Sequence, residues 1–147
     1  MKRKSNFLIF ILLIIFSLSF ELQAQVIGKL YSKSDADNIY GPVLNSASIN
    51  TSDLQTMLLK TQNYIMFSLV NGSPEILDNN RNSLYPTNLI VSSSQVFSLF
   101  SVSIVQELLT KGGSSLTTIE NRQKTLTLTN GEITLEMGQL CPPFCIQ

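Results

Sequence analysis

The chain has 147 residues, with ten basic and ten acidic residues and neither histidine nor tryptophan. Without histidine, Ser-His-Asp and Cys-His catalytic arrangements and histidine-ligated metal sites are excluded. After residue 24, Lys and Arg do not cluster, so this part of the sequence does not favour nucleic-acid binding.

Residues 1–24 have the layout of a secretory signal peptide. Three basic residues precede an uncharged apolar run from Phe7 to Phe20, and a polar stretch then leads to Ala24. As a helix, this run would span about 21 Å, which is short of the ~30 Å hydrocarbon core of a membrane. We predict cleavage between Ala24 and Gln25, with export to the periplasm or outside the cell and no membrane span afterwards. The alternative is an uncleaved membrane anchor.

Residues 25–147 are predicted to form one α+β domain with a C-terminal tail clipped by two cysteines. This part of the chain is rich in Ser, Thr and Asn and poor in charge, which suits an exported protein with many strands and turns. Its length is sufficient for a hydrophobic core. No low-complexity linker divides it.

The first half is predicted to alternate short helices with strands. A helix begins near Ser34–Asp37 and stops at Gly41-Pro42, and a strand follows at Val43–Ile49. A capping box at Ser52–Gln55 opens a helix that runs to Gln62, with leucines on one side. The leucines are Leu54, Leu58 and Leu59. Tyr64–Leu77 is predicted to be a hairpin around Asn71-Gly72, with Pro74 in a short or edge strand.

The second half ends in the hairpin with the clearest pattern. Weaker strands are predicted around Val96–Phe100 and at Leu116–Ile119, with a helix from Ser103 to Lys111 between them. Strict alternation on both sides of Asn130-Gly131 predicts a type I′ hairpin over Thr125–Met137. Its Leu, Ile and Met side chains are expected to face the core, and its Thr and Glu side chains to face water.

The acidic residues do not form a recognisable site in the sequence. Glu132 and Glu136 share the Thr face of the predicted hairpin, so we expect both to be solvated. Asp78–Ser83 resembles the first half of a calcium loop but lacks its glycine and its final glutamate, and Asp35–Asp37 fails sooner. We interpret both segments as turns or caps.

Two asparagines, Asn50 and Asn71, begin sequences that match the N-glycosylation pattern. They are relevant only if the chain passes through a eukaryotic secretory pathway.

The tail CPPFC contains the two cysteines of the chain, Cys141 and Cys145. In an oxidising compartment, two cysteines without a third predict one disulfide, and a turn at Pro143-Phe144 or a cis proline bond would bring them together. Free or intermolecular thiols, and a metal or redox function, are the alternatives. No basic residue lies within ten positions of Cys141, which disfavours a stabilised thiolate.

The sequence therefore favours a small exported, non-catalytic domain that binds a partner or ligand in the cell envelope or outside the cell. It indicates no catalytic, cofactor-binding or metal-ligating residues. One alternative is a small exported hydrolase that uses carboxylates or a Ser–Lys pair. Another is a subunit of an envelope assembly, for which Ser92–Leu109 is the candidate docking segment if it is not simply the central strand and helix of the domain.

Overall fold

The computed structural model describes residues 25–142 and residue 145, and it shows the predicted α+β fold. Two antiparallel five-stranded sheets carry the strands in the orders β1-β9-β8-β7-β2 (sheet A) and β10-β6-β3-β4-β5 (sheet B). The strands of sheet A are β1 (Lys29–Ser32), β2 (Val43–Asn50), β7 (Leu116–Arg122), β8 (Leu126–Asn130) and β9 (Ile133–Glu136). The strands of sheet B are β3 (Tyr64–Val70), β4 (Ser73–Asp78), β5 (Ser83–Tyr85), β6 (Phe97–Ser101) and β10 (Gln139–Cys141).

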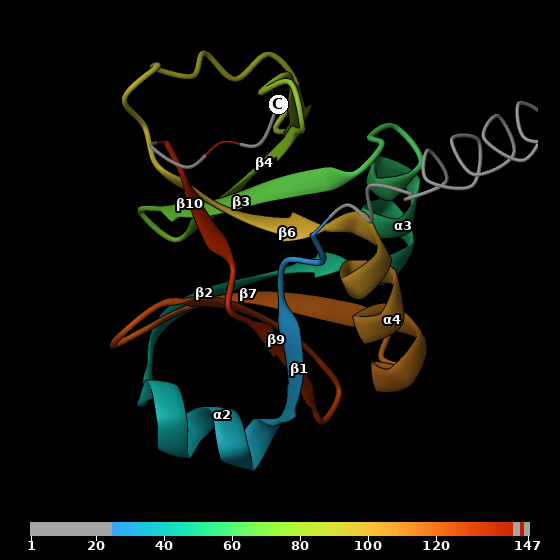
Figure 1. Cartoon of the computed structure of the whole chain (residues 1–147), viewed down its shortest axis with the longest axis vertical. Coiled ribbons are helices and arrows are strands. Elements are labelled where there is room, and N and C mark those ends of the chain that lie inside the picture. Colours follow the sequence, from blue (N-terminus) through green and yellow to red (C-terminus); the bar gives the residue numbers. More distant parts are fainter. Residues whose placement is uncertain (1–24, 143–144, 146–147) are drawn as a thin grey trace, which may run out of the picture.

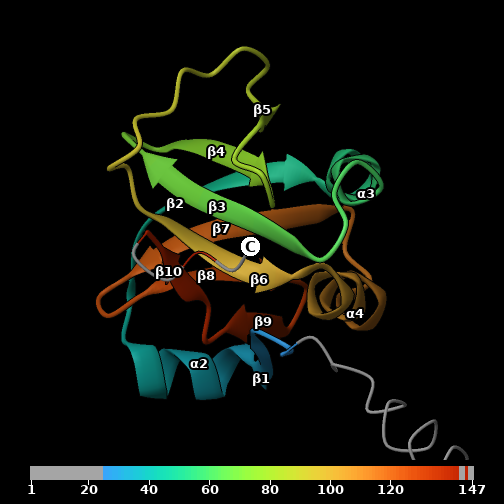
Figure 2. The same ribbon diagram turned by 45° about the horizontal axis from the view of Figure 1, so that its top comes forward.

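The three helices of the described chain lie in two places. Helices α3 (Thr51–Leu58) and α4 (Val102–Gly112) lie side by side at one end of the two sheets, whereas α2 (Lys33–Tyr40) lies on the outer side of sheet A (Figures 1 and 2). The main hydrophobic core fills the space between the inner faces of the sheets and the two paired helices. Its largest fully buried side chains include Phe67 and Phe100, whose rings meet edge to face.

Sheet B is covered on both faces. A second hydrophobic cluster, which contains Met66, Leu99 and Cys141, lies on its outer side and is covered by Leu89 and Val91 of the long loop after β5. All five residues of β6 are buried, which explains the apolar side chains that face several ways in Ser92–Leu109. That segment contains a central strand and a core helix, as the simpler interpretation of its sequence predicts.

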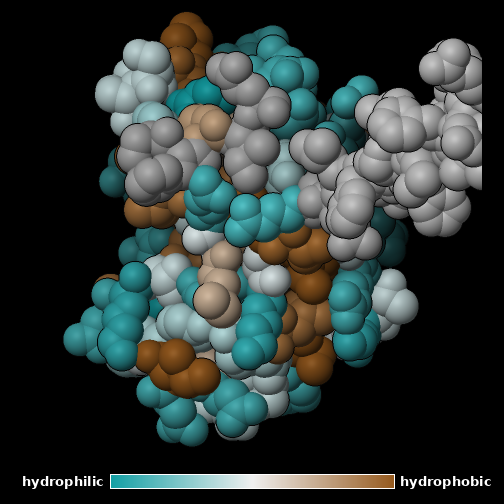
Figure 3. All heavy atoms as spheres, in the orientation of Figure 1, coloured by the Kyte–Doolittle hydropathy of each residue, from teal (hydrophilic) through white to brown (hydrophobic). Residues whose placement is uncertain are grey.

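One hydrophobic strip is visible on the face that Figure 3 shows, between β1 and α4. Leu30 of β1 and Ile104 of α4 are partly buried against the main core. We therefore interpret the strip as the margin of the core.

The hairpin of β3 and β4 has the predicted turn. Val70 pairs with Ser73, and both Asn71 and Gly72 have positive φ, as a type I′ turn requires. Pro74 lies in a strand of six residues that is not an edge strand, because β5 follows it in the sheet. The proline is tolerated because β5 pairs only with the other end of β4.

The hairpin of β8 and β9 forms, but its turn is displaced by one residue. Asn130 pairs with Ile133, so Gly131 and Glu132 are the central residues, and of these two only Gly131 has positive φ. This is the pattern of a type II′ turn, and the predicted type I′ turn is wrong. Asn130 stays in the strand because its buried amide group is needed there. It binds groups on three segments: Thr51 of α3, Ser114 of the loop after α4, and Leu116 with Thr117 of β7.

The N-caps of α3 and α4 lie two residues before Ser52 and Ser103, the serines that their capping boxes predict as N-caps. Asn50 and Ser101 are the N-caps of α3 and α4, and neither makes a side-chain capping hydrogen bond. Helix α3 ends at Leu58 instead of Gln62, and Leu59 is 83% exposed, so it does not share the buried side of Leu54 and Leu58. Helix α4 ends as predicted, with the following Gly113 in the left-handed conformation.

Candidate functional site

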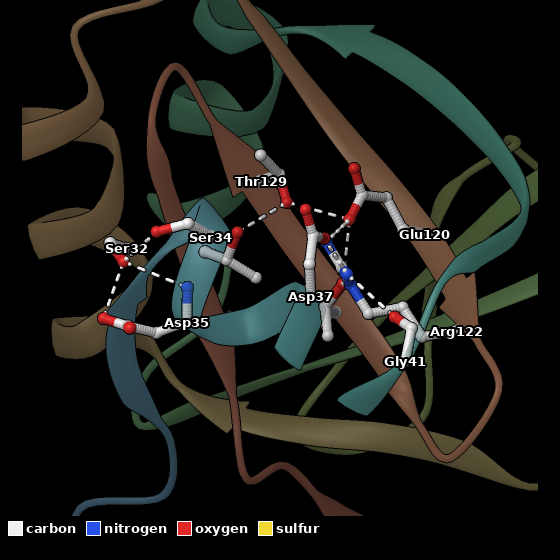
Figure 4. Close-up of polar contacts among 10 residues, drawn as sticks. Ser32, Ser34, Asp35, Asp37, Gly41, Glu120, Arg122 and Thr129 are labelled. Atoms are coloured by element: carbon white, nitrogen blue, oxygen red, sulfur yellow. Dashed lines mark hydrogen bonds and ion pairs between the residues drawn. The ribbon is translucent and has the colours of Figure 1, made fainter. Parts of the chain in front are cut away.

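A buried polar cluster lies between α2 and the outer face of sheet A. Its centre is Arg122, whose side chain has no exposed surface and forms ion pairs with Asp37 of α2 and, at 2.8 Å, with Glu120. The guanidinium group also donates to the carbonyl oxygen of Gly41 at 3.1 Å. Figure 4 shows Asp37 and Gly41 reaching this cation from α2 and its C-cap, so the cluster fastens the helix to the sheet.

Threonine hydroxyls complete the cluster. Those of Thr127 and Thr129 donate to Oε2 of Glu120 at 3.1 and 3.0 Å, and Nε of Arg122 donates to Thr127. Thr129 shares a further hydrogen bond with Thr134. The prediction that this Thr face is solvated is wrong, because α2 covers it. The sequence pattern of the hairpin cannot show this cover, since the helix lies about 80 residues earlier.

The two glutamates of the hairpin have different environments. Glu132 is exposed in the turn, as predicted, but Glu136 is only 4% exposed, and its predicted solvation is wrong. The hydroxyl of Thr125 and the backbone N–H of Met137 donate to its carboxylate. Buried carboxylates need such partners, because desolvation otherwise disfavours the charged form.

Two groups of this region have shifted pKa values. Burial, with hydrogen bonds and charges from Tyr31 and Glu136, raises the pKa of Tyr40 well above its usual value of 10.0. Burial alone would lower the pKa of Arg122, but the hydrogen bonds and charges of Asp37 and Glu120 raise it. Arg122 therefore stays protonated, and no buried side-chain N or O atom in residues 25–142 lacks a hydrogen-bond partner. We interpret the cluster as structural.

Strand β2 is an edge strand of sheet A with mostly exposed residues. Within the described residues, β2 pairs with β7 on one side and with no strand on the other. Six of its eight residues are exposed, and none is charged. A bulge at Leu44, which is 66% exposed, leaves a regular stretch from Asn45 to Asn50. An uncovered, uncharged edge of this kind is a template for another strand.

A hollow of about 420 Å³ lies beside the C-terminal half of β2. Leu84 and Tyr85 of β5 line it, so it lies between the edge strands of the two sheets, and Asp53 and Lys60 supply its charges. The complete lining is Ser48, Ile49, Asn50, Asp53, Thr56, Met57, Lys60, Leu84, Tyr85 and Leu116. A strand added to β2 would direct alternate side chains toward this hollow.

A second hollow, of about 430 Å³, lies where α3 and α4 meet the start of the described chain. It is lined by uncharged residues, among them the exposed Leu59 and Val26. Its polar lining comes largely from Gln62, Asn63 and Gln106. This hollow is not apparent from the sequence, because its lining comes from separate segments.

The predicted cysteine pair is brought together at the end of β10. The sulfur atoms of Cys141 and Cys145 are bonded, their Cα atoms are 4.6 Å apart, and the Cys141–Pro142 peptide bond is cis. The predicted turn at Pro143-Phe144 and the predicted cleavage site at Ala24 lie outside the described residues. Gln25 is exposed at the start of the described chain.

Arg81 is the neighbour of this pair that sequence reasoning missed. Its Nη1 lies 3.6 Å from Sγ of Cys141 and donates to the Cys141 carbonyl oxygen at 3.3 Å. Sixty positions separate the two residues, so spacing along the chain could not reveal the contact.

The acidic segments interpreted as turns or caps have those roles. The Asp78 carboxylate accepts hydrogen bonds from Asn80 and Asn82 within its own turn. At the start of α2, the N-cap Ser32 accepts a hydrogen bond from the backbone N–H of Asp35, and the Asp35 carboxylate accepts one from the Ser32 hydroxyl. Asp37 does more than predicted, because it forms the ion pair with Arg122. Residues 25–142 and 145 contain no group of three or more potential His, Cys, Asp or Glu metal ligands.

Comparison of the chain with protein-family models, with curated proteins and with solved structures finds no match. In the described part of the chain, no helix has both the length and the apolar character needed to cross a membrane.

Proposed function

We propose that this chain is an exported, non-catalytic interaction module that binds an extended segment of a partner protein by strand addition at β2. The observation that carries the proposal is the open, uncharged edge of β2 beside the hollow between the two sheets. Strand addition obtains affinity from backbone hydrogen bonds and specificity from pockets for alternate side chains. The signal-like N-terminal segment supports export.

The chemistry of the edge defines the kind of segment that fits. Ser46 and Ser48 are exposed, and Ser48 shares a hydrogen bond with Thr118 on the neighbouring strand. Small polar side chains on the outer side of the segment would continue this hydroxyl surface. On the inner side, Ile49 and Leu84 line the hollow and favour an apolar side chain. The expected ligand is an uncharged segment of about six residues that alternates polar and apolar side chains.

A peptide segment fits this edge better than a second copy of the chain. The regular part of β2 is bounded by the bulge at Leu44 and by α3, which begins at Thr51 directly after the strand. In a twofold antiparallel pairing, each copy would bring its own bulge and helix against the opposite end of the other strand. A single extended segment brings neither.

Site-specific photo-crosslinking in the producing cells tests the proposal. A photoreactive residue replaces Ser46 on the edge or, in a separate variant, Leu59 in the α3–α4 hollow. We expect Ser46 to yield an adduct with a different protein, and peptide mapping to place the crosslink in an uncharged segment. Asn45→Lys should abolish the adduct by charging the edge, whereas the matched control Ser73→Lys, on exposed β4 backbone, should not.

Three results would contradict the proposal. An adduct of twice the chain mass would show that β2 pairs with a second copy, as in an assembly subunit. An adduct from the Leu59 position alone would move the binding surface to the α3–α4 hollow. Absence of any adduct from Ser46 would leave the edge without a partner in the cell.

A further inference from the structure

The two sulfur atoms of the bridge have different surroundings. Cys141 is fully buried, ends β10 and lies opposite Phe97 of β6 in the sheet register. Cys145 is exposed. Of the two cysteines, Cys145 is therefore the more accessible to an external thiol.

Arg81 places a positive charge against the buried sulfur. Its Nη2 donates to the carbonyl oxygens of Ser92 and Gln95 at 3.2 and 2.9 Å, and its guanidinium group lies over the ring of Phe97 at 5.3 Å. These contacts fix the group with Nη1 beside Sγ of Cys141. Among residues 25–142 and 145, no carboxylate forms an ion pair with Arg81. The contacts of its guanidinium group in this part of the chain are with carbonyl oxygens, the ring and the sulfur.

A fixed cation beside a sulfur atom favours that sulfur as a leaving group. Thiol–disulfide exchange is faster when the departing thiol has a lower pKa, and a neighbouring Arg lowers a thiol pKa by stabilising the thiolate. The exposure of Cys145 and the charge of Arg81 beside Cys141 thus favour the same reaction, in which the thiol attacks Cys145 and Cys141 is the leaving group. This arrangement was not expected from the sequence, in which no cation is near the cysteines.

We infer that the Cys141–Cys145 bridge is an exchange site for small thiols, with Cys145 as the attacked sulfur and Cys141 as the leaving group. A thiolate RS⁻ bonds to Sγ of Cys145, the Cys141–Cys145 bond breaks, and its electron pair remains on Cys141 beside Arg81. A second thiolate then bonds to the sulfur of the R group and releases Cys145 as a thiolate. Two RSH molecules are oxidised to RSSR, and the bridge gains two electrons and two protons.

The rate of reduction by glutathione tests this inference on the oxidised chain that begins at Gln25. We expect Arg81→Gln to slow the reduction by roughly three- to tenfold, because a thiol pKa that falls by ~1–2 units beside a cation rises again without it. Arg81→Lys should be intermediate, since it keeps the charge but not the planar fork. Lys33→Gln, which removes an exposed charge on α2, should leave the rate unchanged.

The direction of the rate change separates this role from a purely structural one. If Arg81 only holds the loop and the tail together, Arg81→Gln loosens the tail and accelerates reduction. A rate in Arg81→Gln that equals or exceeds that of the parent chain would therefore overturn the inference.

The site of the first bond gives an independent readout. Acid quenching during the reaction, followed by peptide mass spectrometry, should find glutathione on Cys145 and a free thiol at Cys141. In the Cys145→Ser variant, the midpoint of the thiolate absorbance of Cys141 in a pH titration should lie below ~8.5 and rise when Arg81 is also replaced by Gln. Glutathione on Cys141, or the same titration midpoint with and without Arg81, would refute the assignment.

Discussion

The outer face of sheet A has two halves that are built from similar hydroxyl residues but differ in what covers them. Under α2, the hydroxyls of Thr127, Thr129 and Thr134 are buried around Glu120 and Arg122. At the β2 edge, the hydroxyls of Ser46 and Ser48 are exposed. A hydroxyl-rich strand face is therefore compatible with either a dry or a wet environment, and a single short helix decides between them.

The covered half and the open half of this face are expected to contribute to different properties, folding stability and binding. In the covered half, each polar group has partners within the protein, so its removal leaves another buried group unsatisfied. In the open half, water replaces any lost partner, and the free backbone of the edge is available to another chain. Substitutions in the first half should change folding free energy, whereas those in the second should change binding.

The largest effect is expected from removal of the central cation. Arg122→Met should destabilise the fold by about 3–5 kcal/mol, because it leaves the buried carboxylate of Glu120 and the ion-pair partner Asp37 without their counter-charge. Urea unfolding measures the difference. The control Lys124→Met removes an exposed cation and should change stability by at most ~0.5 kcal/mol. Equal changes in unfolding free energy for Arg122→Met and Lys124→Met would show that water reaches the polar groups of the cluster.

A buried hydroxyl should have the next largest effect. Thr129→Val removes one donor to Glu120 and the hydrogen-bond partner of Thr134 while keeping the shape of the side chain. We expect a loss of about 1–3 kcal/mol in the free energy of unfolding, again by urea titration. A loss below ~0.5 kcal/mol would mean that water enters beneath α2.

The pH dependence of the unfolding free energy tests the environment of Tyr40, the last residue of α2, in the covered half. Because the folded-state pKa of Tyr40 is raised above 10.0, its protonated form is favoured in the fold, and this contribution is fully present below the unfolded pKa. It is lost as the pH rises from about 10 through the folded-state pKa, as the unfolded chain ionises first. Denaturant midpoints measured across this range should fall less steeply in Tyr40→Phe. Tyr85→Phe, at an exposed residue, should retain the slope of the parent chain.

The smallest effect is expected for the hydroxyl pair of the open half. Ser48 and Thr118 are 3.0 Å apart, the same separation as Thr129 and Thr134, but their hydrogen bond is exposed. Thr118→Val should therefore change the unfolding free energy by no more than ~0.5 kcal/mol in a parallel urea titration. A loss comparable to that of Thr129→Val would show that this half is also shielded from water.

Local patterns in the sequence were sufficient to predict most elements of the fold. Period-two alternation located the β8–β9 hairpin, the Asn71-Gly72 pair located the β3–β4 hairpin, and α4 ends within one residue of the predicted Lys111. These features depend on neighbours within a few positions, so they are visible in a linear sequence. The capping boxes at Ser52 and Ser103 placed the N-caps two residues too late, because the helices begin directly from the preceding strands.

The features that define the candidate sites depend on contacts between distant segments. Asp37 meets Arg122 across 85 positions, and Arg81 meets Cys141 across 60. One signal was present in the sequence: Glu120 and Arg122 are two residues apart directly after the strand predicted at Leu116–Ile119. In the structure β7 includes both residues, so they share a face and form a charge pair. Opposite charges on the face of a strand that also carries Thr indicate a paired polar cluster as readily as a solvated surface.

The asparagines of the two Asn-Gly pairs should deamidate at different rates. Cyclisation of asparagine onto the following backbone nitrogen, which leads to deamidation, requires a free amide and a mobile peptide. Asn71 is exposed in its turn, and a Cβ placed on Gly72 would meet no atom within 4 Å. Asn130 is fully buried with its amide bonded on both sides, and a Cβ at Gly112 would lie 2.2 Å from its Oδ1. In stored protein, the first gain of negative charge from these two pairs should therefore occur at Asn71, at the far end of the β3–β4 hairpin.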